Sequence, residues 1–209
     1  MKRRAPDGFT LLELLLAISL LGMITAAIMG GIHLGRRSWE TTRASDALDE
    51  VENAMRATSS LVAKSFVFTP DPTQVRGEGM PPVFLGSPQG CRFVMLSEGG
   101  AQWGGLILAE IGLDNGPNGP ELAVWTKVYR PKDGLSASRG AMKKTVVLAG
   151  VSGLELSYFG AQQAGGRAAA AWEGQWRSAN LPSLVAIRLG AKRLGRIIEV
   201  DTRVAPRQQ

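Results

Sequence analysis

The stretch that decides the fold runs from Phe9 to Ile32 and reads FTLLELLLAISLLGMITAAIMGGI. Among these 24 residues, Glu13 is the one charged side chain. As an α-helix the segment would be about 36 Å long, enough to cross a hydrocarbon core of about 30 Å. A buried helix of a soluble protein is the alternative, but a helix that is apolar on every side needs a larger protein around it. We therefore predict that residues 9–32 form a transmembrane helix.

Basic residues flank both ends of the predicted span, three on each side: Lys2, Arg3 and Arg4 before it, and Arg36, Arg37 and Arg43 after it. Cytoplasmic flanks of membrane spans usually carry an excess of Lys and Arg. Because the two counts are equal here, charge alone leaves the orientation of the span undecided.

A helical pattern continues beyond the apolar stretch. Apolar residues recur at steps of three, four and seven: Leu48, Val51, Met55 and Val62. This spacing places them on one face of an amphipathic helix. Because no proline lies between positions 6 and 70, we predict one helix from about Thr10 to Lys64, with residues 33–64 as its amphipathic continuation. Gly30 and Gly31 weaken its middle, where we expect a kink or partial melting.

The pattern changes from residue 65 onward to short apolar or alternating runs separated by turns. The predicted strands are Phe66–Thr69, Arg92–Leu96, Leu106–Ile111, Leu122–Tyr129, Thr145–Leu148, Leu154–Phe159, Leu184–Leu189 and Ile197–Val204. Strands without long helices between them favour antiparallel sheet. The predicted fold class is α+β: a long N-terminal helix packed against an antiparallel β-sheet, the β-rich domain covering residues 65–209.

The composition limits the chemistry that the chain can perform. It has 209 residues, a formal net charge of +6, one cysteine and one histidine. Cys91 and His33 together cannot supply the four ligands of a usual zinc site, and a lone cysteine forms no intramolecular disulfide. We interpret His33 as a helix-surface residue at the membrane edge and Cys91 as a small buried apolar residue. We therefore expect no catalytic residues, no metal and no cofactor, and predict that the protein is not an enzyme.

Two further patterns suggest a ligand only weakly. Asp114, Asn118 and Gly119 match part of a calcium-binding loop, but its twelfth position is Trp125, which offers no carboxylate. The C-terminal segment from residue 188 to 207 is rich in Arg and Lys, but no RNA- or DNA-binding motif accompanies it. We expect no nucleic-acid partner.

The start of the chain resembles a known processing signal. Gly8-Phe9-Thr10-Leu11-Leu12-Glu13, directly after a short basic leader, is similar to the class III signal of type IV pilins and type II secretion pseudopilins. The resemblance implies that residues 1–8 are a leader, which a prepilin peptidase removes on the cytoplasmic side between Gly8 and Phe9. It also implies that Phe9 then becomes N-methylphenylalanine, and that Glu13 is the acidic residue used in assembly.

The physical chemistry of Glu13 agrees with a role in assembly. A carboxylate within a membrane span costs about 2.5–3.5 kcal/mol, so it should find a partner. The span offers no Lys or Arg, whereas the amine of Phe9 in a neighbouring subunit would be a suitable cation. The alternative is that the Glu13 side chain snorkels to the membrane surface, which is compatible with the first interpretation before assembly.

The second half of the chain resembles one branch of this family. Residues 150–159 read GVSGLELSYF, Trp172 and Trp176 follow, and residues 181–189 read LPSLVAIRL. A Val-x-Gly-Leu strand ending in Tyr-Phe, a Trp-containing loop and a Leu-Pro that opens the next strand resemble the J-type minor pseudopilin of type II secretion. For the two tryptophans themselves, we favour packing in the local core over a ligand role.

This second resemblance implies a pilin-like fold and a structural role. J-type subunits join the I-type and K-type minor pseudopilins in a complex that primes a periplasmic filament of the major pseudopilin, which exports folded proteins across the outer membrane. The expected location is the bacterial inner membrane, with a cytoplasmic N-terminus and a periplasmic C-terminal domain. A minor type IV pilin for surface pili or DNA uptake is the alternative, and a membrane-anchored periplasmic enzyme is a third hypothesis.

Overall fold

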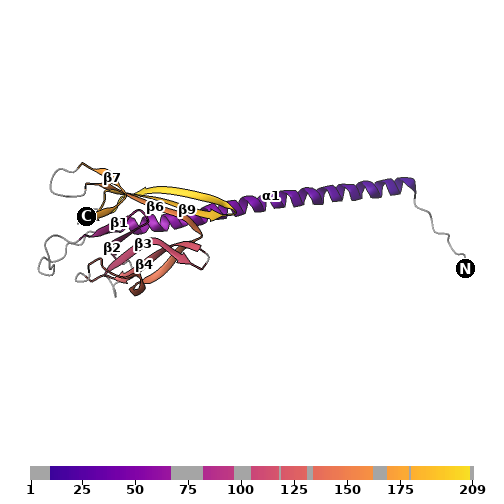
Figure 1. Cartoon of the computed structure of the whole chain (residues 1–209). Coiled ribbons are helices and arrows are strands. Elements are labelled where there is room, and N and C mark those ends of the chain that lie inside the picture. Colours follow the sequence, from indigo (N-terminus) through magenta and orange to yellow (C-terminus); the bar gives the residue numbers. More distant parts are fainter. Residues whose placement is uncertain are drawn as a thin grey trace. The chain divides into compact units, whose positions relative to one another are not determined.

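The computed structural model describes residues 10–66, 82–96, 105–117, 119–130, 134–161, 169–178 and 180–207. The described residues contain one α-helix, α1, Leu11–Ala63 (Figure 1). Its ends agree with the predicted helix to within one residue. Gly30 and Gly31 are both helical, so the partial melting predicted there was wrong. Each glycine costs a helix only about 1 kcal/mol, which a helix of this length tolerates.

The chain divides into two compact units, Met1–Asp46 and Ala47–Gln209, which we call the helical unit and the globular unit. In the described part of the helical unit, residues 10–46, every residue is exposed. The globular unit contains the last part of α1 and all the described strands. The fold is therefore α+β, with a long N-terminal helix whose last part packs against antiparallel sheets, as in pilins.

The last part of α1 buries one face in the globular unit. Its buried residues are Val51, Ala54, Met55, Thr58 and Val62. Leu48, which we predicted on this face, is 40% exposed. It lies about 60° around the helix from Val51, at the margin of the buried face. The small residues Ala54 and Thr58 complete that face instead, and the Thr58 hydroxyl donates to the carbonyl of Ala54 at 2.7 Å.

The larger sheet has six antiparallel strands in the order β5-β4-β3-β2-β1-β8. Their bounds are Lys143–Ala149, Gly119–Val128, Leu106–Gly116, Gly90–Leu96, Phe84–Ser87 and Trp176–Ser178, respectively. The smaller sheet has four antiparallel strands in the order β10-β9-β6-β7. Their bounds are Arg196–Val204, Leu184–Arg193, Val151–Gly160 and Ala171–Glu173.

Seven of the eight predicted strands are confirmed as β2, β3, β4, β5, β6, β9 and β10. Of the eighth, Phe66–Thr69, only Phe66 is a described residue, and its backbone N–H donates to the carbonyl of Val94 at 2.8 Å. Strands β1, β7 and β8 were missed. They have three or four residues each, which is too short for an alternating pattern to be recognised.

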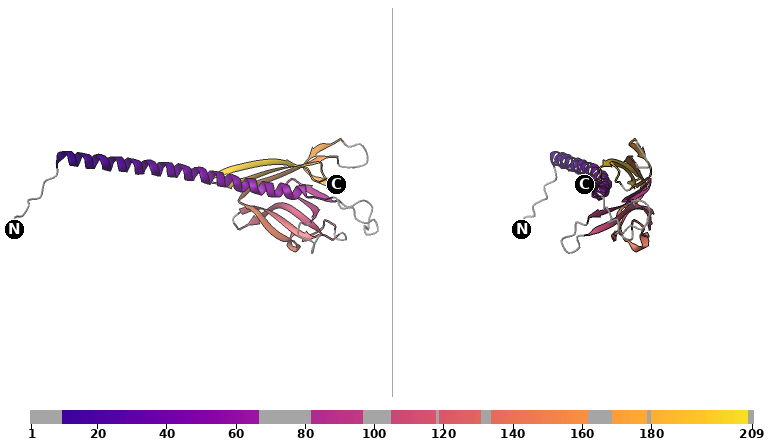
Figure 2. Two further views of the ribbon diagram at one scale, coloured as in Figure 1. Left: turned by 180° about the vertical axis from the view of Figure 1, so that it is seen from behind. Right: turned by 90° about the vertical axis from the view of Figure 1, so that its left-hand side faces the viewer.

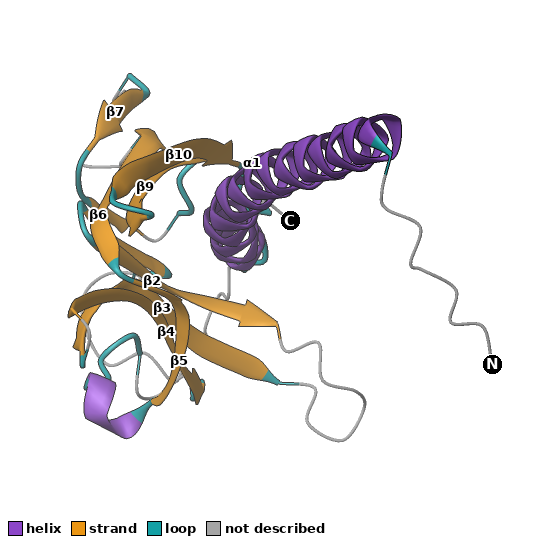
Figure 3. Cartoon of the chain, turned by 90° about the vertical axis from the view of Figure 1, so that its right-hand side faces the viewer, coloured by secondary structure: helices purple, strands orange, loops and turns teal. Residues whose placement is uncertain are grey.

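The main core of the globular unit lies where α1 and the inner faces of both sheets meet. The last part of α1 runs beside both sheets (Figure 3). Phe84 of β1 and Phe93 of β2 are fully buried and stack with ring centroids 5.7 Å apart. The C-terminal segment returns to the end of α1, where the Arg207 N–H donates to the Ala63 carbonyl at 3.2 Å (Figure 2). The end of α1 is thus fixed by side-chain packing and by a backbone hydrogen bond.

A smaller core lies on the other face of the six-stranded sheet. Val94, Leu108, Ala123 and Trp125 supply its sheet side, and the segment 134–142 covers them with Leu135 and Met142. This covering segment includes the short 3₁₀-helix η3, Arg139–Ala141. The six-stranded sheet therefore has apolar packing on both faces.

Candidate functional site

The first turn of α1 carries the sequence motif that we identified at the N-terminus. Thr10 caps the helix: its hydroxyl accepts the Glu13 backbone N–H at 3.3 Å, and its carbonyl accepts the N–H of Leu14 at 3.2 Å. A carboxylate in the first turn is favoured by the partial positive charge of a helix N-terminus. Gly8 and Phe9, the predicted cleavage and methylation positions, lie outside the described residues.

The two side-chain hydroxyls between Glu13 and Ile32 are satisfied within the helix. The hydroxyl of Ser19 donates to the carbonyl of Leu15, and that of Thr25 donates to the carbonyl of Leu21, both at 2.8 Å. Such bonds let a hydroxyl enter lipid without an outside partner. A carboxylate accepts hydrogen bonds, and that of Glu13 has no ion pair within the described residues. Unlike the hydroxyls of Ser19 and Thr25, the Glu13 carboxylate therefore needs a hydrogen-bond donor from outside the helix.

The apolar surface of the helical unit is large and continuous. Bulky side chains from Leu11 to Leu34 are 53% to 79% exposed. The helix is long and apolar enough to cross a membrane, and none of its most apolar part is buried. Soluble monomeric proteins rarely leave a contiguous apolar surface of this kind uncovered. This surface therefore requires lipid or neighbouring helices.

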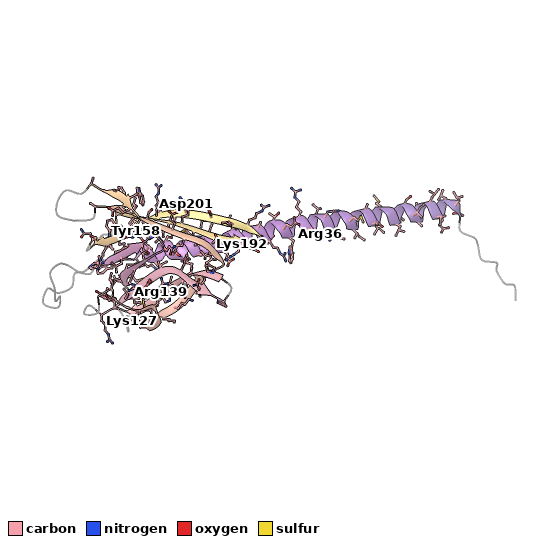
Figure 4. All side chains as sticks on the ribbon, in the orientation of Figure 1. Arg36, Lys127, Arg139, Tyr158, Lys192 and Asp201 are labelled. Atoms are coloured by element: carbon pink, nitrogen blue, oxygen red, sulfur yellow. The ribbon has the colours of Figure 1, made fainter. Side chains whose placement is uncertain are left out.

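The second resemblance rests on residues that the fold brings together in the globular core. Tyr158 of β6 is fully buried, and its hydroxyl lies 2.9 Å from the Ser87 carbonyl and 3.1 Å from the Gly90 carbonyl (Figure 4). Its ring meets Phe84 edge-on, with centroids 5.7 Å apart. Tyr158 thus joins the four-stranded sheet to the β1–β2 turn of the six-stranded sheet. Burial raises the pKa of its hydroxyl, so this hydroxyl remains a donor.

The two tryptophans of the sequence pattern have different environments. Trp176 of β8 is 1% exposed, and its indole N–H donates to the Asn180 carbonyl at 2.9 Å. Core packing is confirmed for Trp176. Trp172 of β7 is 45% exposed, so the prediction of core packing was wrong for it. It lies on an edge strand, where its ring centroid is 5.3 Å from that of Phe159 and 5.8 Å from the Arg203 guanidinium.

Sequence reasoning missed a charged cluster on the outer face of the six-stranded sheet. The Glu110 carboxylate accepts hydrogen bonds from Arg92 of β2 and from Nε of Arg139, the latter at 2.8 Å. Arg92 also donates to the Leu135 carbonyl at 2.7 Å, and the Arg139 guanidinium lies 4.0 Å from the centre of the Trp125 ring. These contacts fasten the covering segment to the sheet. Because Glu110 is engaged by two arginines, one on β2 and one on the covering segment, the cluster has a structural function.

The remaining candidates from the sequence occupy ordinary structural positions. His33 is exposed on α1. Cys91 is 3% exposed in the core, and burial raises the pKa of its thiol, so it is an inert apolar residue as predicted. Asp114 pairs with Lys144 at 2.5 Å, and Asn118 lies outside the described residues. Among the described residues, no three His, Cys, Asp or Glu side chains are grouped so that they could hold a metal ion.

The comparison with protein families gives one result. The model of the prokaryotic N-terminal methylation motif matches residues 3–29. This motif fits a type IV pilin-like protein, pilin or pseudopilin. It implies processing by a prepilin peptidase and assembly with other pilin-like subunits, and it suggests a structural subunit rather than an enzyme. The comparison with curated proteins gave no match.

Proposed function

We propose that the chain is a J-type minor pseudopilin of type II secretion, which joins the I-type and K-type minor pseudopilins in a tip complex that primes the filament of the major pseudopilin. The observation that carries the pilin-like part of this proposal is the helical unit. It has a methylation motif at its start, a carboxylate in its apolar stretch, Glu13, without an ion pair among the described residues, and an apolar surface that its own chain leaves exposed. Such a helix suits a subunit stored in a membrane and then transferred into a helical assembly.

The proposed maturation follows from the motif. Residues 1–8 are the leader, and the prepilin peptidase cuts between Gly8 and Phe9 on the cytoplasmic side and methylates the amine of Phe9. Residues 9–32 then hold the subunit in the inner membrane, 33–64 continue the helix, and 65–209 form the periplasmic domain. The unbroken course of α1 across residues 32 and 33 supports the assignment of residues 33–64 as a continuation of the same helix.

Glu13 is proposed to make the assembly contact. In the membrane its side chain reaches the interface by snorkelling. In the filament its partner is the methylated amine of Phe9 in a neighbouring subunit, where the low dielectric makes an unpaired charge costly. The absence of an ion pair at Glu13 among the described residues leaves its carboxylate available for that contact.

The J-type assignment is supported by the core contacts of the second half. Tyr158, Trp176 and Leu181 are each at most 6% exposed, and they come from the three sequence segments that carry the resemblance. A minor type IV pilin would share the N-terminal signal, so the assignment depends on these segments and on the partners. Co-purification tests it directly.

The experiment uses a tagged copy of the full chain expressed from its own locus. We expect I-type and K-type minor pseudopilins to co-purify with it after mild cross-linking, and deletion of its gene to stop export of folded proteins while surface pili remain. Recovery of pilus components in their place, with normal export and lost pili, would favour the minor type IV pilin and overturn the proposal.

A further inference from the structure

Residues 33–45 of the helical unit, which follow the apolar span, gather their charged side chains on one face. At 100° per residue, six charged or aromatic side chains fall within an arc of about 160°: His33, Arg36, Arg37, Trp39, Glu40 and Arg43. The opposite arc of the same segment carries no charge: Leu34, Gly35, Ser38, Thr41, Thr42 and Ser45. All twelve residues are exposed. We call the first group the basic face, whose three arginines outnumber its single glutamate.

Trp39 and Arg43 form a defined pair on the basic face. The guanidinium of Arg43 lies 5.4 Å from the centre of the Trp39 ring, one helical turn back, and the Trp39 side chain is 65% exposed. Side chains on a helix lean toward its N-terminus. The Arg43 side chain therefore extends back along the helix toward the apolar span, over the Trp39 ring.

The first part of the basic face lies at the depth of the headgroup layer of a bilayer. Arg36 and Arg37 follow Ile32 by four and five residues, which corresponds to about 6 and 8 Å along the axis. Trp39 and Arg43 follow it by seven and eleven residues, about 11 and 16 Å, and their side chains lean back toward the span. The polar layer on each side of the hydrocarbon core is about 5–8 Å thick. Tryptophan is enriched in this layer, and the guanidinium of arginine matches phosphate with two parallel hydrogen bonds.

We propose that the basic face, with Arg36, Arg37 and Arg43 as its ligating residues, binds the phosphate headgroups of anionic phospholipids. Charge complementarity and continuity with the apolar span select this partner. The inference rests on the transmembrane placement of residues 9–32 in the proposed function and does not depend on secretion. On this proposal the uncharged opposite face does not bind lipid headgroups.

Native mass spectrometry of the full chain in a mild detergent tests this proposal, with phosphatidylglycerol and phosphatidylcholine of the same acyl chains as probes. We expect the wild type to retain phosphatidylglycerol preferentially. The triple variant Arg36→Gln, Arg37→Gln and Arg43→Gln should lower its affinity for phosphatidylglycerol on the order of 100-fold, about fivefold per arginine, and leave that for phosphatidylcholine unchanged.

A matched variant removes three positive charges from exposed positions of the globular unit: Lys143→Gln, Lys192→Gln and Arg196→Gln. It should retain the wild-type preference. Equal retention of the two lipids by the wild type, or an unchanged preference in the arginine variant, would overturn the proposal. Loss of oligomers in that variant without any lipid preference in the wild type would also overturn it, by assigning the basic face to acidic residues of a second copy. Failure of the secretion role would change none of these results.

Discussion

Gly86→Ala should destabilise the globular unit, because the added methyl group has no room. A Cβ atom at Gly86 would lie 2.4 Å from Cζ of Tyr158 and 2.6 and 2.7 Å from its two Cε atoms. The Tyr158 ring is fully buried and fixed by its hydroxyl bonds to the turn after β1, so it cannot move aside without losing them. Overpacking of this kind costs about 1–3 kcal/mol. We expect about 2–3 kcal/mol, which lowers the Tm of a unit of this size by roughly 4–12 °C.

A double-mutant cycle assigns this cost to the Tyr158 ring. Tyr158→Leu is itself destabilising by about 2–4 kcal/mol, but in that background Gly86→Ala should cost less than about 0.5 kcal/mol, since the clashing atoms are gone. Tyr158→Phe is the control, because it keeps the ring and should preserve most of the penalty. The free energy of unfolding in urea, followed by tryptophan fluorescence, gives each value. An equal cost of Gly86→Ala beside tyrosine and beside leucine would refute the reasoning.

Four further outcomes are expected. Gly8→Val should leave an unprocessed precursor in cells with an active prepilin peptidase, seen as an intact, unmethylated N-terminus by mass spectrometry. Glu13→Ala should leave processing and the globular fold unchanged but reduce cross-linking to the I-type and K-type partners. The fragment 35–209 should be soluble and monomeric by light scattering, because it keeps every buried core residue and omits the apolar span. Glu50→Gln should cost about 0.5–1 kcal/mol at pH 7, measured by urea unfolding, and nearly nothing in acid.

The acid dependence of Glu50 follows from its partner. Arg193 donates to its carboxylate at 2.7 and 2.9 Å, and these hydrogen bonds lower the pKa of Glu50 in the folded state. A lowered carboxyl pKa adds stability above the unfolded pKa of about 4.3, and that stability is lost as the pH falls through the folded value. The difference in stability between wild type and Glu50→Gln should therefore shrink as the pH falls below about 4.3 and vanish below the lowered pKa of the folded state. Glu52→Gln is the control on the same helix. Glu52 lies 3.9 Å from Arg56, a long contact between two exposed side chains, so its replacement should change the free energy of unfolding little.

Two results would contradict the other predictions. Asp49→Ala, which removes a carboxylate from an exposed position later in the same helix and outside the basic face, is the control for Glu13→Ala and should cross-link normally. Wild-type cross-linking in Glu13→Ala at normal protein levels would mean that its pairing is unnecessary in this subunit. An aggregated fragment 35–209 with intact helix and sheet signals in circular dichroism would mean that the globular unit also needs the membrane span.

The helix and most strands could be predicted because their signals are local. The spacing from Val51 to Val62 and the alternation in residues 154–158 record one buried face each, and a buried face leaves a periodic pattern. The division of the strands into two sheets left no such pattern, since it depends on pairings such as Phe84 with Ser178 across the chain. The same applies to Glu110, whose partners Arg92 and Arg139 lie 18 and 29 positions away.

The N-terminal motif could be predicted from the sequence, whereas the packing contacts of the globular core could not. Gly8, Phe9 and Glu13 form a contiguous pattern that the matched motif covers. Nothing in the sequence indicated that Gly86 lies beneath Tyr158. A glycine that is needed because a neighbouring side chain packs closely against it cannot be told from the sequence alone from a glycine that is needed in a turn. Trp172 and Trp176 looked equivalent for a related reason: both lie in short strands, and only the pairing of those strands decides which tryptophan is buried.

The helical unit depends on its surroundings for stability, and the charged residues at the two ends of the span decide which surroundings it prefers. Residues 10–46 gain no burial from their own chain, whereas burying one large apolar side chain provides about 1.5–3 kcal/mol. The membrane or neighbouring helices must therefore supply that stabilisation. On the proposals above, transfer from lipid to filament breaks the headgroup contacts of the basic face and gives Glu13 its amine. The arginines then oppose extraction and Glu13 favours it, so removing the arginines should partly compensate the assembly defect of Glu13→Ala. Cross-linking of the combined variant at the level of Glu13→Ala alone would show that the two ends act independently.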